Sequence, residues 1–169
     1  GHEAVSTILV FLSVYGLNAK SKIDGMSPIL INEKQFDEKI TLIDTPEDDE
    51  SIGFKIDASG AKKHNLEVIK NGIPNTFFHT RRTAKELNMK NTYHELFGWG
   101  DNFGGIATNL ELSKGTTSHE DMISSVKKGI FINLGKSSKS TLRGINCPIN
   151  YSVAYASYGV KAAIAPEIP

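Results

Sequence analysis

The alternation of apolar and polar positions in residues 64–89 predicts a β-hairpin that leads directly into a helix. Asn71-Gly72 separates two apolar runs, and both residues tolerate the positive φ that the central positions of a type I′ turn need. The incoming strand is expected at Leu66–Lys70 and the outgoing strand at Ile73–His79. A tight hairpin is therefore the clearest local feature of this chain.

The pattern after the hairpin changes to that of a short basic helix. Ala84 and Leu87 are three residues apart and so lie on one helical face. Thr80 can cap the first turn with its hydroxyl oxygen, and Asn88 can end the helix in a left-handed conformation. We expect the helix between these two residues.

Further strands are predicted where short apolar or alternating runs recur. In residues 106–112 the alternation is regular, since Thr108, Leu110 and Leu112 face one way and the residues between them face the other. Shorter runs of the same kind give expected strands at residues 40–44, 54–57 and 130–134.

Two further helices are expected, at residues 3–17 and 118–128. The first is apolar on nearly every side, which predicts that it is buried on most sides and that another segment normally precedes it. In the second, Ser118 is the expected N-cap, and Lys127-Lys128-Gly129 is a typical helix end.

The remaining segments are expected to be loops: residues 18–37, 91–105 and 135–144. Residues 91–105 are rich in glycine and aromatic residues but lack the spacing of a dinucleotide-binding motif. A loop of this length is either functional or a packed surface loop whose aromatics fill local gaps. The acidic run at residues 47–50 fits a solvated loop better than a cation site, because its carboxylates are consecutive.

These elements together predict an α+β fold, in which short antiparallel hairpins form one or two curved sheets with about three packed helices. The 169 residues are enough for one domain or for a fragment of a larger protein.

Composition excludes several classes of function. The chain has 19 basic and 19 acidic residues, a balance that gives no footprint for direct nucleic-acid or membrane binding. One cysteine excludes an internal disulfide framework. The apolar run at residues 8–17 is too short for a membrane span, which needs roughly 20 apolar residues. We expect a cytoplasmic protein.

The hairpin and the helix after it resemble the TldD/PmbA family, bacterial and archaeal proteins named as modulators of DNA gyrase and as peptide-maturation proteases. The resemblance rests on Asn71-Gly72, on Phe77-Phe78-His79, and on Thr83-Ala84 with Leu87. Residues 120–132 are the second specific match, and Ile43-Asp44 and residues 56–60 agree as well.

The resemblance implies that residues 1–169 are the C-terminal domain of such a protein. The match covers roughly residues 40–157, and residues 3–39 are placed by their order alone. Residues 158–169 stay unassigned, and the N-terminal domain of the family is expected to be absent. The implied partner is a TldD-type subunit or a second copy of the chain, and the implied substrate is an extended peptide.

The family's active members carry a zinc ion on an H-E-x-x-x-H helix, where two histidines on one face share the metal and the glutamate activates its water. This chain has His2-Glu3, but Thr7 stands at the second ligand position, and His2 is either native or vector-derived. We therefore expect zinc in a TldD-type partner and no cofactor in this chain.

No other residue completes a metal site or a catalytic set in the sequence. His94-Glu95 and His119-Glu120 lack a second histidine at the required spacing, and we expect ordinary polar residues there. His64 and His79 are isolated, and Cys147 does not match the ligand context of the family. No catalytic, cofactor-binding or metal-binding residue is assigned.

Three functions remain open. The first is a non-catalytic, PmbA-like (TldE-like) subunit of a zinc metalloprotease that processes unfolded peptides. The second is an active metallopeptidase of the same family, and the third is a non-enzymatic module associated with gyrase. The incomplete H-E-x-x-x-H motif favours the first and leaves the enzymatic status of the chain open.

Overall fold

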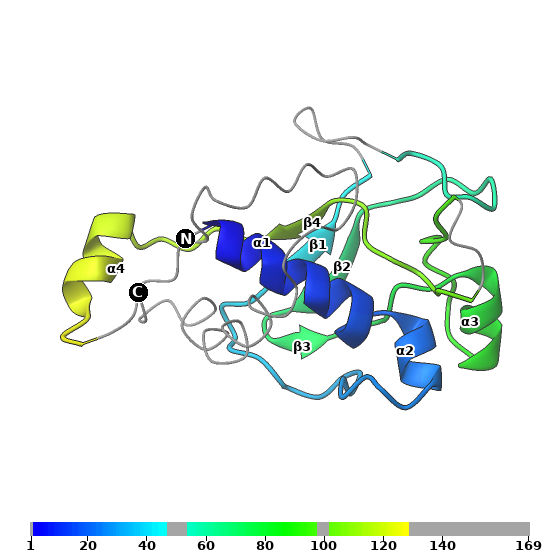
Figure 1. The fold of residues 1–169 in the computed structure, drawn as a ribbon, viewed down its shortest axis with the longest axis horizontal. Helices are drawn as coiled ribbons and strands as arrows, with labels where there is room; N and C mark the ends of the chain where they lie inside the picture. Colours follow the sequence, from blue (N-terminus) through cyan, green and yellow to red (C-terminus); the bar gives the residue numbers. More distant parts are fainter. Residues whose placement is uncertain (1, 47–53, 98–101, 129–169) are drawn as a thin grey trace. The chain divides into compact units, whose positions relative to one another are not determined.

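The computed structural model describes residues 2–46, 54–97 and 102–128. The chain divides into two compact units, one made of residues 1–10 and 115–169 and the other of residues 11–114. The larger unit holds the sheet and is shown with the smaller one in Figure 1.

A four-stranded antiparallel sheet with the order β3-β2-β1-β4 organises the larger unit (Figure 1). Its strands are β1 (Leu42–Asp44), β2 (Leu66–Lys70), β3 (Ile73–Pro74) and β4 (Leu110–Leu112). The long sequence separation between β1 and β4 means that the centre of the sheet joins distant parts of the chain.

The predicted hairpin is present. β2 has the expected bounds, and both Asn71 and Gly72 have positive φ, 48° and 78°. The outgoing strand is shorter than predicted, since β3 includes Ile73 and Pro74 only. Because β3 is an edge strand, the missing N–H of Pro74 leaves no central ladder position unsatisfied.

The helix after the hairpin is α3 (Arg81–Glu86). Thr80 is its N-cap, and Thr80 and Thr83 bond each other's backbone in a reciprocal capping box. Asn88 follows the helix with a φ of 50°, the left-handed conformation expected at a helix end.

The first expected helix is present as α1 (His2–Phe11), which continues into the π-helix η1 (Leu12–Gly16). The expectation that it is buried on most sides is wrong at Val10 and Tyr15, which are 57% and 54% exposed.

A short helix, α2 (Ala19–Ile23), replaces the first part of the loop expected at residues 18–37. Asn18 caps α2 by accepting a hydrogen bond from the Lys20 amide at 2.8 Å. Its sequence, AKSKI, has only Ala19 and Ile23 as apolar positions at helical spacing, too few for hydrophobic periodicity to reveal the helix.

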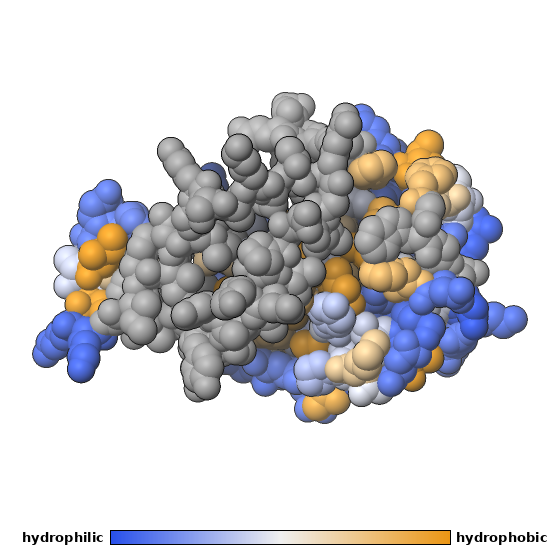
Figure 2. Space-filling view, viewed as in Figure 1, coloured by the Kyte–Doolittle hydropathy of each residue, from blue (hydrophilic) through white to orange (hydrophobic). Residues whose placement is uncertain are grey.

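Charged residues cover α2 and α3 at the lower right of Figure 2. Much of this charge is paired along the helices, because Lys20 contacts Asp24 and Arg82 contacts Glu86 at a spacing of four residues. The surface of α2 and α3 is therefore less basic than their lysines and arginines suggest.

The core of the larger unit combines strand and loop residues. Leu42, Val68 and Ile69 lie in the sheet, and Phe77 and Phe78 extend the apolar layer beyond β3. All five are at most 2% exposed. This core encloses the polar end of β1, where Asp44 lies.

The smaller unit contains α4 (His119–Ser125), with Ser118 as the expected N-cap, accepting from the Asp121 amide at 3.0 Å. The predicted strand at residues 130–134, the predicted loop at residues 135–144 and the acidic run at residues 47–50 lie outside the described residues.

Helices and one antiparallel sheet make this an α+β fold, which confirms the predicted class. Within the described ranges, no helix has both the length and the apolar character that crossing a membrane requires.

Candidate functional site

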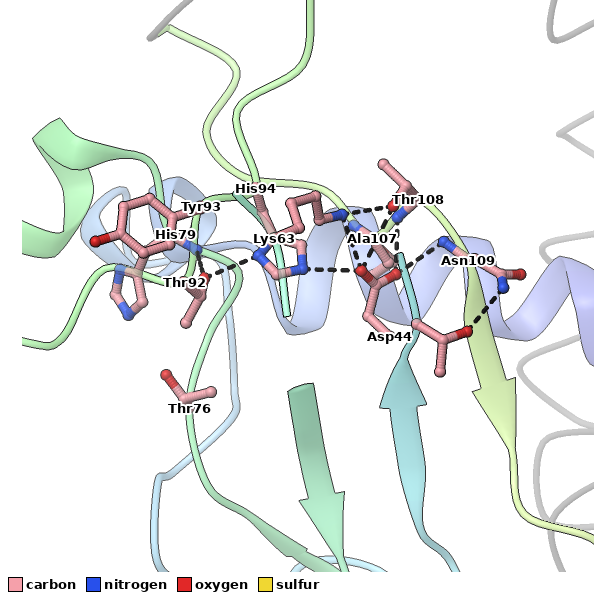
Figure 3. Close-up of polar contacts among 12 residues, drawn as sticks. Asp44, Lys63, Thr76, His79, Thr92, Tyr93, His94, Ala107, Thr108 and Asn109 are labelled. Carbon is pink, nitrogen blue, oxygen red and sulfur yellow. Dashed lines mark hydrogen bonds and ion pairs between the residues drawn. The ribbon is translucent and has the colours of Figure 1, made fainter. Parts of the chain in front are cut away.

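A buried acid–base cluster lies at the end of β1 (Figure 3). Its centre is the carboxylate of Asp44, which is fully buried. Oδ1 accepts hydrogen bonds from the amides of Thr108 and Asn109, each at 2.8 Å. This oxygen therefore helps to hold the segment that enters β4 at the end of β1.

The second oxygen of Asp44 faces two nitrogen groups. The Lys63 ammonium donates to Oδ2 at 3.0 Å, and Nε2 of His94 lies 3.0 Å from the same atom. Lys63 also donates to the Thr108 hydroxyl. The side chains of Asp44, Lys63 and His94 are at most 1% exposed, so water does not share these contacts.

The partners of His94 suit one neutral tautomer, which we assign to it. In this tautomer Nε2–H donates to Asp44, and the unprotonated Nδ1 lies 3.1 Å from the Thr92 hydroxyl. Thr92 in turn accepts from the His79 amide at 2.7 Å. The ring is thus held at both nitrogens, and it also packs against the Phe78 ring at a centroid distance of 4.9 Å.

The electrostatics of the cluster follow from burial and pairing. Burial alone would raise the pKa of the Asp44 carboxyl, but the hydrogen bond from His94, the charge of Lys63 and the Asn109 amide hold that pKa below its usual range. Burial and the Lys63 charge lower the pKa of His94, although its bond to Asp44 opposes this. The cluster is therefore one carboxylate, one ammonium and one neutral imidazole.

His79 is a second buried histidine beside the cluster. Burial, and to a lesser extent His94, lowers the pKa of His79 from 6.5 to about 4. Its Nδ1 lies 3.5 Å from the Thr83 hydroxyl, whereas its Nε2 has no hydrogen-bond partner among the described residues. A neutral ring tolerates this position, because an unprotonated nitrogen costs less to bury than a charged one.

The arrangement of the cluster suits the positioning of chain segments rather than catalysis. An aspartate–histidine pair can orient a general base, but here Lys63 shares the same carboxylate oxygen. Full burial also keeps these side chains from any substrate in the described structure. What the arrangement does is join four segments of the chain at one carboxylate.

The cluster is not predicted from the sequence. The expectation that His94 is an ordinary polar residue is wrong, since it is 1% exposed and bonded at both nitrogens. Lys63 was not singled out at all. The only sequence signal was the Ile43-Asp44 pair at a strand end, and a strand end alone does not identify distant partners.

The other sequence candidates are spread over the structure. His64 and His119 are exposed, and His119 begins α4. The side chains of His2 and Glu3, and all of Cys147, lie outside the described ones. In the described part of the chain, no three His, Cys, Asp or Glu side chains gather as metal ligands.

Helix α1 does not fit the zinc ligand set that the resemblance implies. Thr7 offers a hydroxyl group where structural and catalytic zinc sites use imidazole, thiolate or carboxylate. No step is assigned to a metal here.

Comparison with known proteins identifies the class. Residues 1–157 match the family model described as the PmbA/TldA metallopeptidase C-terminal domain. The chain belongs to this PmbA/TldD family, which confirms the resemblance found in the hairpin and helix.

Two archaeal relatives carry the name metalloprotease. The protein from Methanothermobacter thermautotrophicus is 24% identical over 102 residues, which cover 60% of this chain and 22% of that protein. The protein from Archaeoglobus fulgidus is 37% identical over 57 residues, which cover 34% of this chain and 13% of that protein. The matched regions are less than a quarter of each relative.

Solved structures share the fold. A proposed modulator of DNA gyrase from Thermotoga maritima aligns with a TM-score of 0.60 and 21% identity, covering 69% of this chain and 27% of that one. TldE from Thermococcus kodakarensis aligns with a TM-score of 0.57 and 22% identity, covering 68% of this chain and 28% of that one. A proposed modulator of DNA gyrase from Bacteroides thetaiotaomicron aligns with a TM-score of 0.59 and 24% identity. The alignment covers 73% of this chain and 26% of that one.

Proposed function

We propose that this chain is the C-terminal region of a PmbA-like (TldE-like) subunit that does not itself hold the catalytic zinc. The observation that carries the proposal is Thr7 on α1, at the position where the family motif has its second histidine. Family membership and the likeness to TldE support the same assignment.

The proposed partner is a TldD-type subunit that supplies zinc and the catalytic glutamate. The proposed activity of the pair is hydrolysis of extended, unfolded peptides in the cytoplasm. In this pair the present chain shapes and closes the peptide chamber. A second copy of the chain is the alternative partner.

Zinc content tests this proposal. The full-length protein, purified alone, is expected to hold far less than one zinc per chain by elemental analysis, and a complex with a TldD-type partner is expected to hold about one zinc per pair. The matched variants are His2→Ala and His64→Ala, the latter at an exposed histidine outside the motif. About one zinc in the isolated protein, lost in His2→Ala and kept in His64→Ala, would contradict the proposal.

The second candidate is an active metallopeptidase. It is favoured by the name metalloprotease on both archaeal relatives, one of them 37% identical to this chain over the matched residues. Under this proposal other residues replace the missing ligand, and the isolated full-length protein cleaves unstructured peptides in a chelator-sensitive reaction.

A further inference from the structure

Three backbone hydrogen bonds link His94 and Glu95 to other segments of the larger unit. The His94 amide donates to the His79 carbonyl at 2.9 Å, and the His94 carbonyl accepts from the Ile106 amide at 3.1 Å. One residue further on, the Glu95 carbonyl accepts from the Ala58 amide at 2.9 Å. The His94 ring adds the only side-chain contact from this segment to Asp44 among the printed bonds of the described residues.

The residue before His94 is in an unfavourable backbone conformation. Tyr93 has a φ of 59°, whereas the other described non-glycine residues with positive φ are asparagines, which tolerate it. For a bulky residue this conformation is a local strain that the surrounding contacts must hold. It is held here on one side by Asn91, which accepts from the Tyr93 amide at 3.0 Å, and on the other by the docked His94 ring.

The charge balance of the cluster depends on His94 being neutral. Asp44 carries one negative charge, and Lys63 already supplies one positive charge to Oδ2. A protonated His94 would place a second cation against the same oxygen and leave the buried cluster with a net positive charge. Uncompensated buried charge is costly, so protonation favours a state in which the ring reaches water.

We propose that the contact of His94 with Asp44 is a pH-sensitive latch, which holds residues 91–97 against the end of the sheet at neutral pH and releases them when His94 takes up a proton. The device is separate from the proposed peptidase partnership and needs no ligand.

The groups around His94 determine the sign of the effect. Asp44 faces it from β1, Lys63 from the segment before β2, and His79 from the segment before α3; Thr92 and the Phe78 ring are its uncharged neighbours. Asp44 favours the protonated ring, whereas burial, Lys63 and a protonated His79 oppose it.

Because burial lowers the pKa of His94 below 6.5, the closed latch binds fewer protons than the released state. The closed state is therefore fully stable above pH 6.5 and loses stability as the pH falls below it. At about pH 5, the closed-to-open ratio is expected to be smaller than at neutral pH by at most about 30-fold, the limit set by protonation of a released imidazole with an ordinary pKa of about 6.5.

Amide hydrogen exchange of the 169-residue chain measures this release directly. The reporters are the Ala58 and Ile106 amides, whose acceptors are the carbonyls of Glu95 and His94. The references are the Gly72 and Leu87 amides, which donate to Ile40 and Thr83 away from the latch. Protection factors, corrected for the intrinsic pH dependence of exchange, are compared at about pH 7.5 and about pH 5.

Two variants distinguish the effect of protonating His94 from the effect of protonating His79. His94→Gln keeps a side-chain N–H for Asp44 but cannot be protonated, and His79→Asn removes the neighbouring titratable ring. The expected result is a selective loss of protection, at most about 30-fold, at Ala58 and Ile106 in the wild-type protein and in His79→Asn, and no such loss in His94→Gln.

The same selective loss in His94→Gln would overturn the proposal, as would an equal loss at Gly72 and Leu87, which indicates general acid unfolding. The wild-type ring provides a test that does not depend on variants folding. Nitrogen chemical shifts of His94 at about pH 7.5 are expected to show the neutral Nε2–H tautomer, and a doubly protonated ring at that pH would overturn the latch.

Discussion

Lys63 places an ammonium group in the interior of the larger unit, 2% exposed, within 3.0 Å of the Asp44 carboxylate. A buried ion pair adds little net stability compared with an apolar pair, but the removal of one partner leaves the other charged and unpaired. At neutral pH, Lys63 therefore compensates the charge of the buried Asp44 carboxylate.

The variant Lys63→Met tests this dependence. We expect it to lower the free energy of unfolding by about 3 kcal/mol at neutral pH, because the Asp44 carboxylate then stays buried without its cation. The loss should be smaller at lower pH, where His94 can take up a proton without Lys63 beside it. Urea unfolding monitored by circular dichroism measures both values.

The matched control is Lys70→Met. Lys70 pairs with Glu67 at 2.9 Å, but the two side chains are 57% and 44% exposed, so its removal should cost less than about 1 kcal/mol. Equal effects of the two lysine substitutions would contradict the assigned role of Lys63.

The cluster could not be predicted from the sequence, for a physical reason. His94 lies 50 residues from Asp44, and Lys63 lies 19 residues from it. Periodicity and short motifs report contacts within one element, whereas this cluster forms only when strand pairing brings distant loops together. An isolated histidine in a sequence therefore does not reveal its burial.

At the scale of elements, the hairpin turn is held against the preceding loop. The Gly72 carbonyl accepts from the amides of Gln35 and Phe36, and the Gly72 amide donates to Ile40 at 2.8 Å. A side chain at position 72 would meet this loop, because an added Cβ would lie 2.3 Å from the Phe36 carbonyl oxygen.

The variant Gly72→Ala is expected to destabilise the protein by about 3 kcal/mol, from left-handed strain together with the collision. Gly60→Ala is its control, since Gly60 has a φ of 80° but nothing within 4 Å of an added Cβ. The control should cost about 1 kcal/mol from strain alone. Similar thermal unfolding midpoints for the two variants would show that the close approach at Gly72 does not contribute to the loss of stability.

Sequence patterns predict those elements correctly that contain their own turn or capping residues. Asn71-Gly72 gave the turn, and Thr80, Asn88 and Ser118 gave helix ends that the structure confirms. Helix α2 cannot be predicted in this way, because a segment of five residues offers only Ala19 and Ile23 as an apolar pair. Its stability comes from the Asn18 cap and from packing, neither of which is a periodic signal.

At the scale of the whole molecule, the α+β class followed from the sequence because alternating runs and capped helices are both frequent in it. Family membership followed from the hairpin–helix unit, which the family model confirms over residues 1–157. The role within the family is a proposal, because the matched regions of the archaeal relatives are less than a quarter of those proteins.

Hydrolysis of an unstructured peptide tests the central claim most directly. The full-length protein, a TldD-type partner and their mixture are assayed with the same fluorogenic peptide, with and without a chelator. The proposed function predicts no chelator-sensitive cleavage by the full-length protein alone and clear cleavage by the mixture. Chelator-sensitive cleavage by this protein alone, abolished in His2→Ala, would contradict it and assign the chain to the active peptidases.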